Sequence, residues 1–265
     1  MHPLRHSTAR TTAVATGLAA AAALALAAPA GAASTTTTTA AGSAGATAKY
    51  NAALTAIGAK GVHFSSIAKQ NGAELDVSGD AGKTSGGQTL VVKSNKATER
   101  MSALVIKSTG YVKGNQAALA NVIGLTKAES TKYANKWLSF PTSNQGLGEL
   151  VGGLLSSEVA KELEIGGPYT YGKSATVGGQ QATAINGAVA NSSGGKVPVV
   201  LYIPSSGTPL PIREVTNAGN AGGSSAIHGI VTFTNWGENK SQTAPTKSFP
   251  LLSLVPASSS SSTAG

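Results

Sequence analysis

The amino-acid sequence predicts a single α+β domain built around an antiparallel sheet. Strand-like segments occupy residues 62–113, helical periodicity dominates residues 115–163, and strand-like segments return over residues 176–236. A parallel sheet would alternate strands and helices along the chain, so this grouping favours antiparallel pairing. Glycine accounts for 33 of the 265 residues, and aromatic residues make up only 5%. This composition predicts many turns and a core of Val, Ile, Leu and Ala.

The N-terminus has the features of an export signal. Arg5 and Arg10 precede or flank an almost unbroken Ala/Leu run over residues 14–28, and small residues around Ala30-Ala32 offer a cleavage site. A run of about 15 residues is too short for a typical membrane-spanning helix. We therefore predict a signal peptide at 1–32, a flexible Ala/Ser/Thr linker at 33–47, the folded domain at 48–252 and a disordered tail at 253–265.

Charge and cysteine content limit the classes of function. The 20 basic residues exceed the 11 acidic ones by nine, and loss of Arg5 and Arg10 with the signal reduces that excess to seven. A basic exported protein can contact anionic membrane headgroups. Its lysines are dispersed rather than clustered, which argues against nucleic acid as a partner. The absence of cysteine excludes disulfides, thiolate metal sites and a cysteine nucleophile.

Local patterns predict the order of the elements. Apolar residues first recur at helical spacing just before Gly58, at Tyr50, Ala53, Leu54 and Ile57. This spacing predicts a short helix that ends at the glycine. Downstream, apolar and polar residues alternate around Leu75 and Val77, the pattern of a sheet with one wet face. Residues 79–87 predict a long glycine-rich turn. Further strands are expected at 90–93, 97–107, 111–113, 176–181, 181–189, 197–203, 211–217 and 227–236.

The middle of the chain predicts helices with an apolar face. Apolar side chains recur at helical spacing in two sets: Leu119, Val122 and Ile123, and then Leu147, Val151, Leu154 and Leu155. Gly152 and Gly153 interrupt the second set, and each costs a helix about 1 kcal/mol relative to alanine. The sequence therefore predicts a kink at this glycine pair or the close approach of another segment.

Two short motifs of known enzyme classes occur without their required context. Gly82-Lys83-Thr84 ends like a phosphate-binding loop, but Val77 stands where that motif needs its first glycine. Ser66 and Lys69 have the Ser-x-x-Lys spacing, which must begin a helix for both side chains to share a face. In a strand, residues three apart point to opposite faces. We interpret the first motif as a hairpin turn and the second as coincidence.

Histidines and carboxylates show no catalytic or metal-binding pattern. The chain after the signal has two histidines, His63 and His228, each expected on the polar side of a strand. The sequence brings neither together with a carboxylate, as a catalytic triad or a metal site requires. Glu158, Glu162 and Glu164 end a helical stretch, which is more typical of a solvated face than of paired catalytic carboxylates.

The two tryptophans allow two interpretations. Trp137 follows a helical region and Trp236 ends a strand, so both are expected to plug the core or its rim. The alternative is that an exposed tryptophan enters a membrane interface.

Several segments together resemble a known family. They are Tyr111-Val-Lys-Gly-Asn115, Tyr133-Ala-Asn-Lys-Trp137-Leu-Ser-Phe-Pro141, Val199-Val-Leu-Tyr-Ile203, Leu210-Pro-Ile-Arg213 and Ile230-Val-Thr-Phe233-Thr-Asn-Trp236-Gly237-Glu238. In this order they are similar to the LppX/LprG-type secreted lipoproteins of the LolA-like superfamily, over roughly 48–250. The resemblance implies a curved, unclosed antiparallel sheet, or half-barrel, wrapped around helices, with acyl chains held in the hollow. The lipobox cysteine of that family is missing, so no lipid anchor is expected.

This resemblance implies a non-enzymatic carrier or binder of a lipid or other hydrophobic ligand, working in the cell envelope. The protein is expected to be secreted or held in the cell wall, with no cofactor, no metal and no catalytic residue, and to make transient contact with anionic membranes. The cavity-lining residues would be Leu119, Val122, Ile123, Leu147, Val151, Leu154 and Leu155. Burial contributes about 0.8 kcal/mol per methylene, so an acyl chain needs little polar recognition. The alternative is a secreted structural or interaction protein of the same fold, with a filled core and no ligand.

Overall fold

The computed structural model describes residues 40–254 except 71, 95–96, 191–194 and 219–226. The predicted signal peptide, residues 33–39 of the predicted linker and tail residues 255–265 lie outside this part. The strands are β1 Val62–Gln70, β2 Ala73–Ala81, β3 Ser85–Lys93, β4 Thr98–Ile106, β5 Thr109–Gly114, β6 Leu138–Pro141, β7 Gly166–Tyr171, β8 Ala175–Val177, β9 Gln180–Ala190, β10 Lys196–Pro204, β11 Arg213–Ala218, β12 Ile227–Thr234 and β13 Phe249–Pro250. The helices are α1 Ala40–Ile57, α2 Gln116–Asn121, α3 Lys127–Tyr133, α4 Gln145–Gly148, α5 Ser156–Glu162 and the short 3₁₀ turns η2 Glu149–Val151 and η3 Leu251–Ser253.

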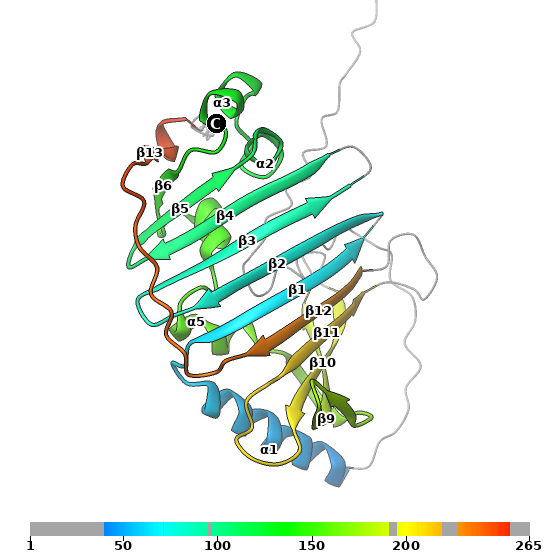
Figure 1. The fold of residues 1–265 in the computed structure, drawn as a ribbon. Coiled ribbons are helices and arrows are strands. Elements are labelled where there is room, and N and C mark those ends of the chain that lie inside the picture. Colours follow the sequence, from blue (N-terminus) through cyan, green and yellow to red (C-terminus); the bar gives the residue numbers. More distant parts are fainter. Residues whose placement is uncertain (1–39, 71, 95–96, 191–194, 219–226, 255–265) are drawn as a thin grey trace, which may run out of the picture.

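All strands of this part of the chain belong to one curved, unclosed sheet (Figure 1). Its order is β13-β6-β5-β4-β3-β2-β1-β12-β11-β10-β9-β7, and β8 pairs with β9. Neighbouring strands are antiparallel except for the short parallel pair of β13 and β6. The two ends of the order, β13 and β7, do not pair with each other, so the sheet stays open. The α+β half-barrel predicted from the sequence is confirmed.

The two faces of the sheet differ in what they contact. Along β1, residues 62, 64, 66, 68 and 70 are buried, and those between them are partly or fully exposed. The register places Gln88 on the same face as this buried set, and Gln88 donates to the Leu150 carbonyl, so the buried set faces the short helical segments; we call this side the concave face. Figure 1 shows α5 behind the sheet. The opposite side is the outer face. Helix α1 packs against β7, beyond the last central strands.

Helix α1 is longer than the sequence predicts. It begins at Ala40, so the second half of the linker expected at 33–47 is helical. Alanine favours helix strongly, and small residues allow α1 to approach β7 closely. A Cβ atom at Gly45 would lie 3.0 Å from the Tyr171 hydroxyl. Further along α1, the Tyr50 hydroxyl accepts a hydrogen bond from the Ile165 amide at 2.8 Å, and burial raises the pKa of Tyr50 to about 12.

The predicted turn at residues 79–87 is mostly strand. β2 continues to Ala81 and β3 starts at Ser85, which leaves a hairpin turn at 82–84. The glycines serve packing here rather than turning. A Cβ atom at Gly79 would lie 2.7 Å from the ring of Phe64, and one at Gly86 would lie 1.9 Å from the Leu154 carbonyl oxygen. No side chain fits at either position without movement of the backbone or the core.

The apolar stretch around Gly152 and Gly153 is divided into three short helical segments. Gly153 has φ +72, a left-handed conformation that favours glycine, and the chain turns there between η2 and α5. The turn docks on the β2–β3 hairpin, because the Gly82 amide donates to the Leu154 carbonyl at 3.2 Å and the Ser156 amide donates to the Gly82 carbonyl at 2.8 Å. The sequence predicted a helix that is kinked or closely approached at the glycine pair; the helix instead ends there and a new one begins at Ser156, and the close approach is to the Leu154 carbonyl.

The sequence did not predict the segment that crosses the ends of the central strands. Residues 235–248 run past the ends of the central strands and lead into β13 (Figure 1). The Gly237 amide donates to the Gly61 carbonyl at 2.8 Å, and the Gln242 amide donates to the Ser85 hydroxyl at 2.8 Å. This segment connects the middle of the sheet to its edge.

Candidate functional site

The concave face is the candidate site, and its centre changes from polar to apolar across the strands. The strand register places one residue of each central strand in a continuous inward-facing row. Passing from β11 to β4, this row consists of Glu214, Val231, Ser66, Val77, Leu90 and Met101. The β2–β4 part of this row is therefore apolar, and a carboxyl and a hydroxyl group enter the row on β11 and β1.

The structure brings all seven predicted cavity-lining residues into one apolar cluster. The fully or almost fully buried members are Leu119, Ile123, Val151 and Leu154, and the partly buried ones that pack against them are Val122, Leu147 and Leu155. They come from α2 and its C-terminal end, from α4 and η2, and from the turn before α5. This cluster also contains buried residues of most of the strands, so it is the hydrophobic core of the whole domain. That they line a ligand cavity stays a prediction.

The polar part of the concave face is built around Glu214. Its side chain is 8% exposed, and its contact within the described residues is a 3.4 Å hydrogen bond donated by the Thr216 hydroxyl. Burial raises the pKa of Glu214 to about 7; the Thr216 hydroxyl acts in the opposite direction, and the charge of Glu162 adds to the increase. A carboxyl group with such a pKa carries its proton for much of the time near neutral pH.

Glu162 corrects one prediction from the sequence. Glu164 is exposed, as expected of a solvated face, but Glu162 is partly buried. Burial raises its pKa, and the charge of Glu158 adds to this effect. Helix α5 therefore turns one carboxyl group inwards, close enough to Glu214 for the two groups to influence each other. Sequence spacing cannot reveal this pair, because the two residues lie 52 positions apart and on different elements.

Two further polar groups on the concave face are incompletely paired. Gln88 donates from Nε2 to the Leu150 carbonyl at 3.0 Å, but its Oε1 atom is buried without a partner among the described residues. The Oε1 atom of Gln70, at the end of β1, is also buried and has no hydrogen-bond partner in the described part of the chain. An unsatisfied buried polar atom costs on the order of 1–3 kcal/mol, so such atoms indicate places for water or for polar groups of a ligand.

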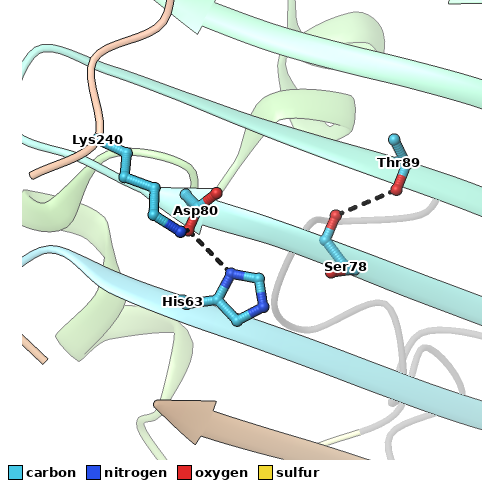
Figure 2. Close-up of polar contacts among 5 residues, drawn as sticks. All are labelled: His63, Ser78, Asp80, Thr89 and Lys240. Atoms are coloured by element: carbon cyan, nitrogen blue, oxygen red, sulfur yellow. Dashed lines mark hydrogen bonds and ion pairs between the residues drawn. The ribbon is translucent and has the colours of Figure 1, made fainter. Parts of the chain in front are cut away.

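The outer face carries ion pairs and the two histidines. Figure 2 shows His63, Asp80 and Lys240 together, with His63 Nδ1 2.8 Å and Lys240 Nζ 2.9 Å from Asp80 Oδ1. Burial acts to raise the pKa of Asp80, but hydrogen bonds from Lys240 and His63 hold it below its usual value. The same view shows Thr89 donating to the Ser78 carbonyl at 3.4 Å. Lys240 belongs to the segment that runs past the strand ends, so the ion pair fixes that segment to β2.

Both histidines lie on the outer face, which confirms that prediction. His228 contacts Asn217 Oδ1 at 2.7 Å, and it is separate from His63. The sequence did not predict the Asp80 partner of His63, which the register of β1 and β2 supplies. Among the described residues, no group of three or more His, Asp and Glu side chains could hold a metal ion. Ser66 is buried while Lys69 is exposed and paired with Glu74, so these two residues point to opposite faces as expected.

The tryptophans occupy different environments. Trp236 is partly buried; its Nε1 donates to the Pro211 carbonyl at 2.8 Å, and its ring lies 5.9 Å from that of Phe233. Trp137 is partly exposed, with the Lys113 ammonium 4.8 Å from the centre of its ring.

In the described part of the chain, no helix combines the length and the apolar character needed to cross a bilayer.

Comparison with solved structures returns proteins of the kind that the sequence resembles. LprF from Mycobacterium bovis covers 76% of this chain and 97% of its own, with 14% identity and a TM-score of 0.48. The lipoprotein LppX from Mycobacterium tuberculosis covers 75% and 98%, with 16% identity and a TM-score of 0.44. A LolA superfamily protein from Nitrosomonas europaea covers 76% and 94%, with 9% identity and a TM-score of 0.24. No protein-family model matches the chain, and no curated protein matches its sequence.

Proposed function

We propose that this protein is an exported, non-enzymatic carrier of an amphipathic lipid or a similar hydrophobic molecule in the cell envelope. The ligand would lie between the concave face and the segments α2, α4, η2 and α5. Its apolar part would contact the cluster that contains Leu119 and Leu154. Its polar part would meet the hydroxyl and carboxyl groups of β1 and β11.

The observation that carries this proposal is the group of polar side chains buried on a mostly apolar concave face. Glu214 is 8% exposed and forms no ion pair within the described residues, and Ser66 is 4% exposed two strands away. A core selected for stability alone would avoid a buried carboxyl group without a cationic partner, because its desolvation is destabilising. Their presence is explained if the space beside them holds the polar end of a ligand or the water that precedes it.

A second function is supported by the burial of the predicted lining residues. Leu119 and Leu154 are 0% exposed, as expected of a core filled by its own side chains. In that case the protein would be a secreted structural or interaction protein of the same fold. The two functions differ in what occupies the space beside Ser66.

Substitution with tryptophan at two adjacent positions separates these functions. Ser66→Trp places a large ring on the concave face, and Ile67→Trp places the same ring on the outer face of the same strand, where Ile67 is 52% exposed. If the hollow is open, Ser66→Trp retains a cooperative thermal transition near that of the parent and loses uptake of a fluorescent fatty acid. Ile67→Trp keeps both properties.

The contrary result is a Ser66→Trp protein that is strongly destabilised while Ile67→Trp is not, since overpacking a filled core costs about 1–3 kcal/mol or more. Organic extraction of the protein purified from its natural host, followed by mass spectrometry, supplies an independent test. A stoichiometric lipid is expected. Absence of any bound hydrophobic molecule, together with absence of fatty-acid uptake, would exclude the carrier function.

A further inference from the structure

One corner of the sheet carries a cluster of lysines around aromatic rings. The residues come from β5, α3, the segment between α3 and β6, and the chain leading into β13, which lie together in Figure 1. We call this cluster the lysine–aromatic surface; its members are Lys113, Lys132, Tyr133, Lys136, Trp137, Lys247 and Phe249.

Two aromatic rings connect three of these lysines, Lys132, Lys136 and Lys247, into one group. The rings of Tyr133 and Phe249 meet edge to face with their centres 5.3 Å apart. Lys136 lies 5.9 Å from the centres of both rings. Lys132 lies 5.1 Å from Tyr133 and Lys247 lies 5.5 Å from Phe249. The backbone of Trp137 is next to this group, because its carbonyl accepts the Phe249 amide at 3.0 Å, and the Trp137 ring contacts Lys113.

The positive charge of this surface is not neutralised by the protein. None of the four lysines forms an ion pair within the described residues, whereas Lys69, Lys93 and Lys240 elsewhere on the sheet do. Glu129, the carboxyl group nearest in sequence, accepts hydrogen bonds from the Thr126 hydroxyl at 2.6 Å and amide at 3.0 Å, and its charge offsets part of that of Lys132 without a direct ion pair. The lysine–aromatic surface therefore presents an excess of cationic groups to solvent.

Exposed apolar groups accompany the charge. Leu252, in η3 directly after β13, is 46% exposed, which is unusual for a large aliphatic side chain in the described part of the chain. Trp137, beside Lys113, is partly buried like Trp236, and the rest of its surface reaches solvent. Lysines alone would suit any polyanion. Lysines combined with tryptophan and leucine suit a surface that offers anionic groups next to hydrocarbon, which is the interface of a lipid bilayer.

We infer that the lysine–aromatic surface, together with Leu252, docks the protein onto a membrane that contains anionic lipids. The ammonium groups contact the headgroups, while Trp137 and Leu252 enter the interfacial layer. Helix α2, which carries part of the predicted lining cluster, packs directly against α3. Docking at this corner therefore places that end of the concave face near the bilayer.

This inference deepens the proposed carrier function, but it can fail independently, because binding to empty vesicles requires no ligand uptake. The measurement is co-sedimentation of the protein with vesicles made from equal parts of phosphatidylglycerol and phosphatidylcholine, and with phosphatidylcholine alone. A lysine near an anionic membrane surface is worth about fivefold in affinity. The triple variant Lys132→Gln, Lys136→Gln, Lys247→Gln is therefore expected to bind the anionic vesicles about 100-fold more weakly.

A matched control has the same change in net charge. Lys83, Lys161 and Lys173 are exposed and belong to the β2–β3 turn, α5 and the chain after β7, away from the proposed surface. The triple variant with glutamine at these three positions is expected to bind nearly as tightly as the parent. Thermal unfolding of all variants shows whether loss of the cation–π contacts has affected the fold, and a single variant, Leu252→Ser, tests the apolar contribution without changing charge.

The outcomes are distinct. The inference is supported if the triple variant of the lysine–aromatic surface and Leu252→Ser both lose binding to anionic vesicles while the control triple variant keeps it. In a Trp236→Phe background, the fluorescence of Trp137 is also expected to shift to the blue on anionic vesicles. Equal losses in both triple variants would reveal a general charge effect and overturn it. Binding to soluble polyanions such as polyglutamate as tight as to vesicles, and unchanged in Leu252→Ser, would also overturn it in favour of an acidic polymer as partner.

Discussion

The two halves of the concave face differ in the polarity of their inward-facing residues. From β2 to β6 the inward residues are mostly apolar, including Val77, Leu90, Val112 and Leu138, and Gln88 is a polar exception among them. On β11 the inward positions hold Glu214 and Thr216 instead, and on β1 Ser66 stands between the apolar inward residues Phe64 and Ala68. The first half has the composition of a stabilising core. The buried polar groups of the second half stabilise the fold less than apolar residues would, which indicates selection for a property other than folding.

The outer face carries apolar side chains opposite the polar part of the concave face. The strand register places Val200, Val215, Ile230 and Ile67 in one outward-facing row across β10, β11, β12 and β1. On β1 and β11, aliphatic side chains therefore face outwards while Ser66, Glu214 and Thr216 face inwards. The inward residues of β10 and β12 are buried and apolar, so the usual relation between polarity and exposure in a one-sided sheet is reversed locally, at β1 and β11.

Truncation in the apolar half should have the largest effect on stability. Leu154 is fully buried, and its carbonyl joins the β2–β3 hairpin to the turn before α5. Leu154→Ala leaves the backbone contacts possible but removes core volume, with an expected loss of about 2–5 kcal/mol in the free energy of unfolding. Ser66→Ala in the polar half, measured by the same denaturant titration, is expected to change it by less than about 1 kcal/mol. Similar losses in both variants would mean that the two halves are one uniformly packed core.

The pH dependence of stability should reveal the polar half. The pKa of Glu214 is about 7 in the folded protein against a reference value of 4.5. As pH rises between these values, the unfolded chain loses its proton while the folded protein retains it, so stability falls with increasing pH and levels off above about 7. Over this pH range the free energy of unfolding is expected to fall by about 3 kcal/mol. Because Glu162 and Glu214 interact, this change belongs to the pair of carboxyl groups.

Glu214→Gln removes this titration, so its free energy of unfolding should vary much less between pH 5 and about pH 8 than that of the parent. The matched control is Glu164→Gln, at an exposed glutamate that follows α5. It should keep the slope of the parent. A parent protein whose stability rises with pH in this range would show that Glu214 is ionised in the fold, and hence that it has a cationic or strongly hydrated environment.

How far the sequence predicted this molecule follows from the same comparison. Periodicity identified the apolar clusters on α2 and before α5, because burial of leucine and valine at helical spacing is what drives those segments to pack. It could not assign Glu214 and Glu162 to the concave side. In the segment Arg213–Ala218, the alternation gives Val215 the apolar character of an inward residue and Glu214 the character of an outward one. Only the register with β10 and β12 decides the face.

The glycines and the sheet edges were missed for a different physical reason. Residues 79–87 read as a turn because glycine permits one, but Gly79 and Gly86 serve close contacts with Phe64 and the Leu154 carbonyl, which are distant in sequence. The edge strands β7 and β13 have weak patterns of their own and are held by partners, α1 and β9 for the first and β6 for the second. Such elements depend on tertiary contacts more than on local preference.

The smallest expected effects come from restoring the usual polarity at two adjacent positions of β11. Val215→Thr makes an outward position polar and should change the free energy of unfolding by no more than about 0.5 kcal/mol, since the residue is only partly buried. Thr216→Val makes an inward position apolar and removes the hydroxyl that donates to Glu214 at 3.4 Å. The loss should be at most about 1 kcal/mol where Glu214 is ionised, near pH 8, and should disappear near pH 5, where Glu214 holds its own proton. Denaturant titrations at both pH values measure the difference. A loss of equal size at both would show that Thr216 stabilises the strand by packing, and would remove it from the polar site.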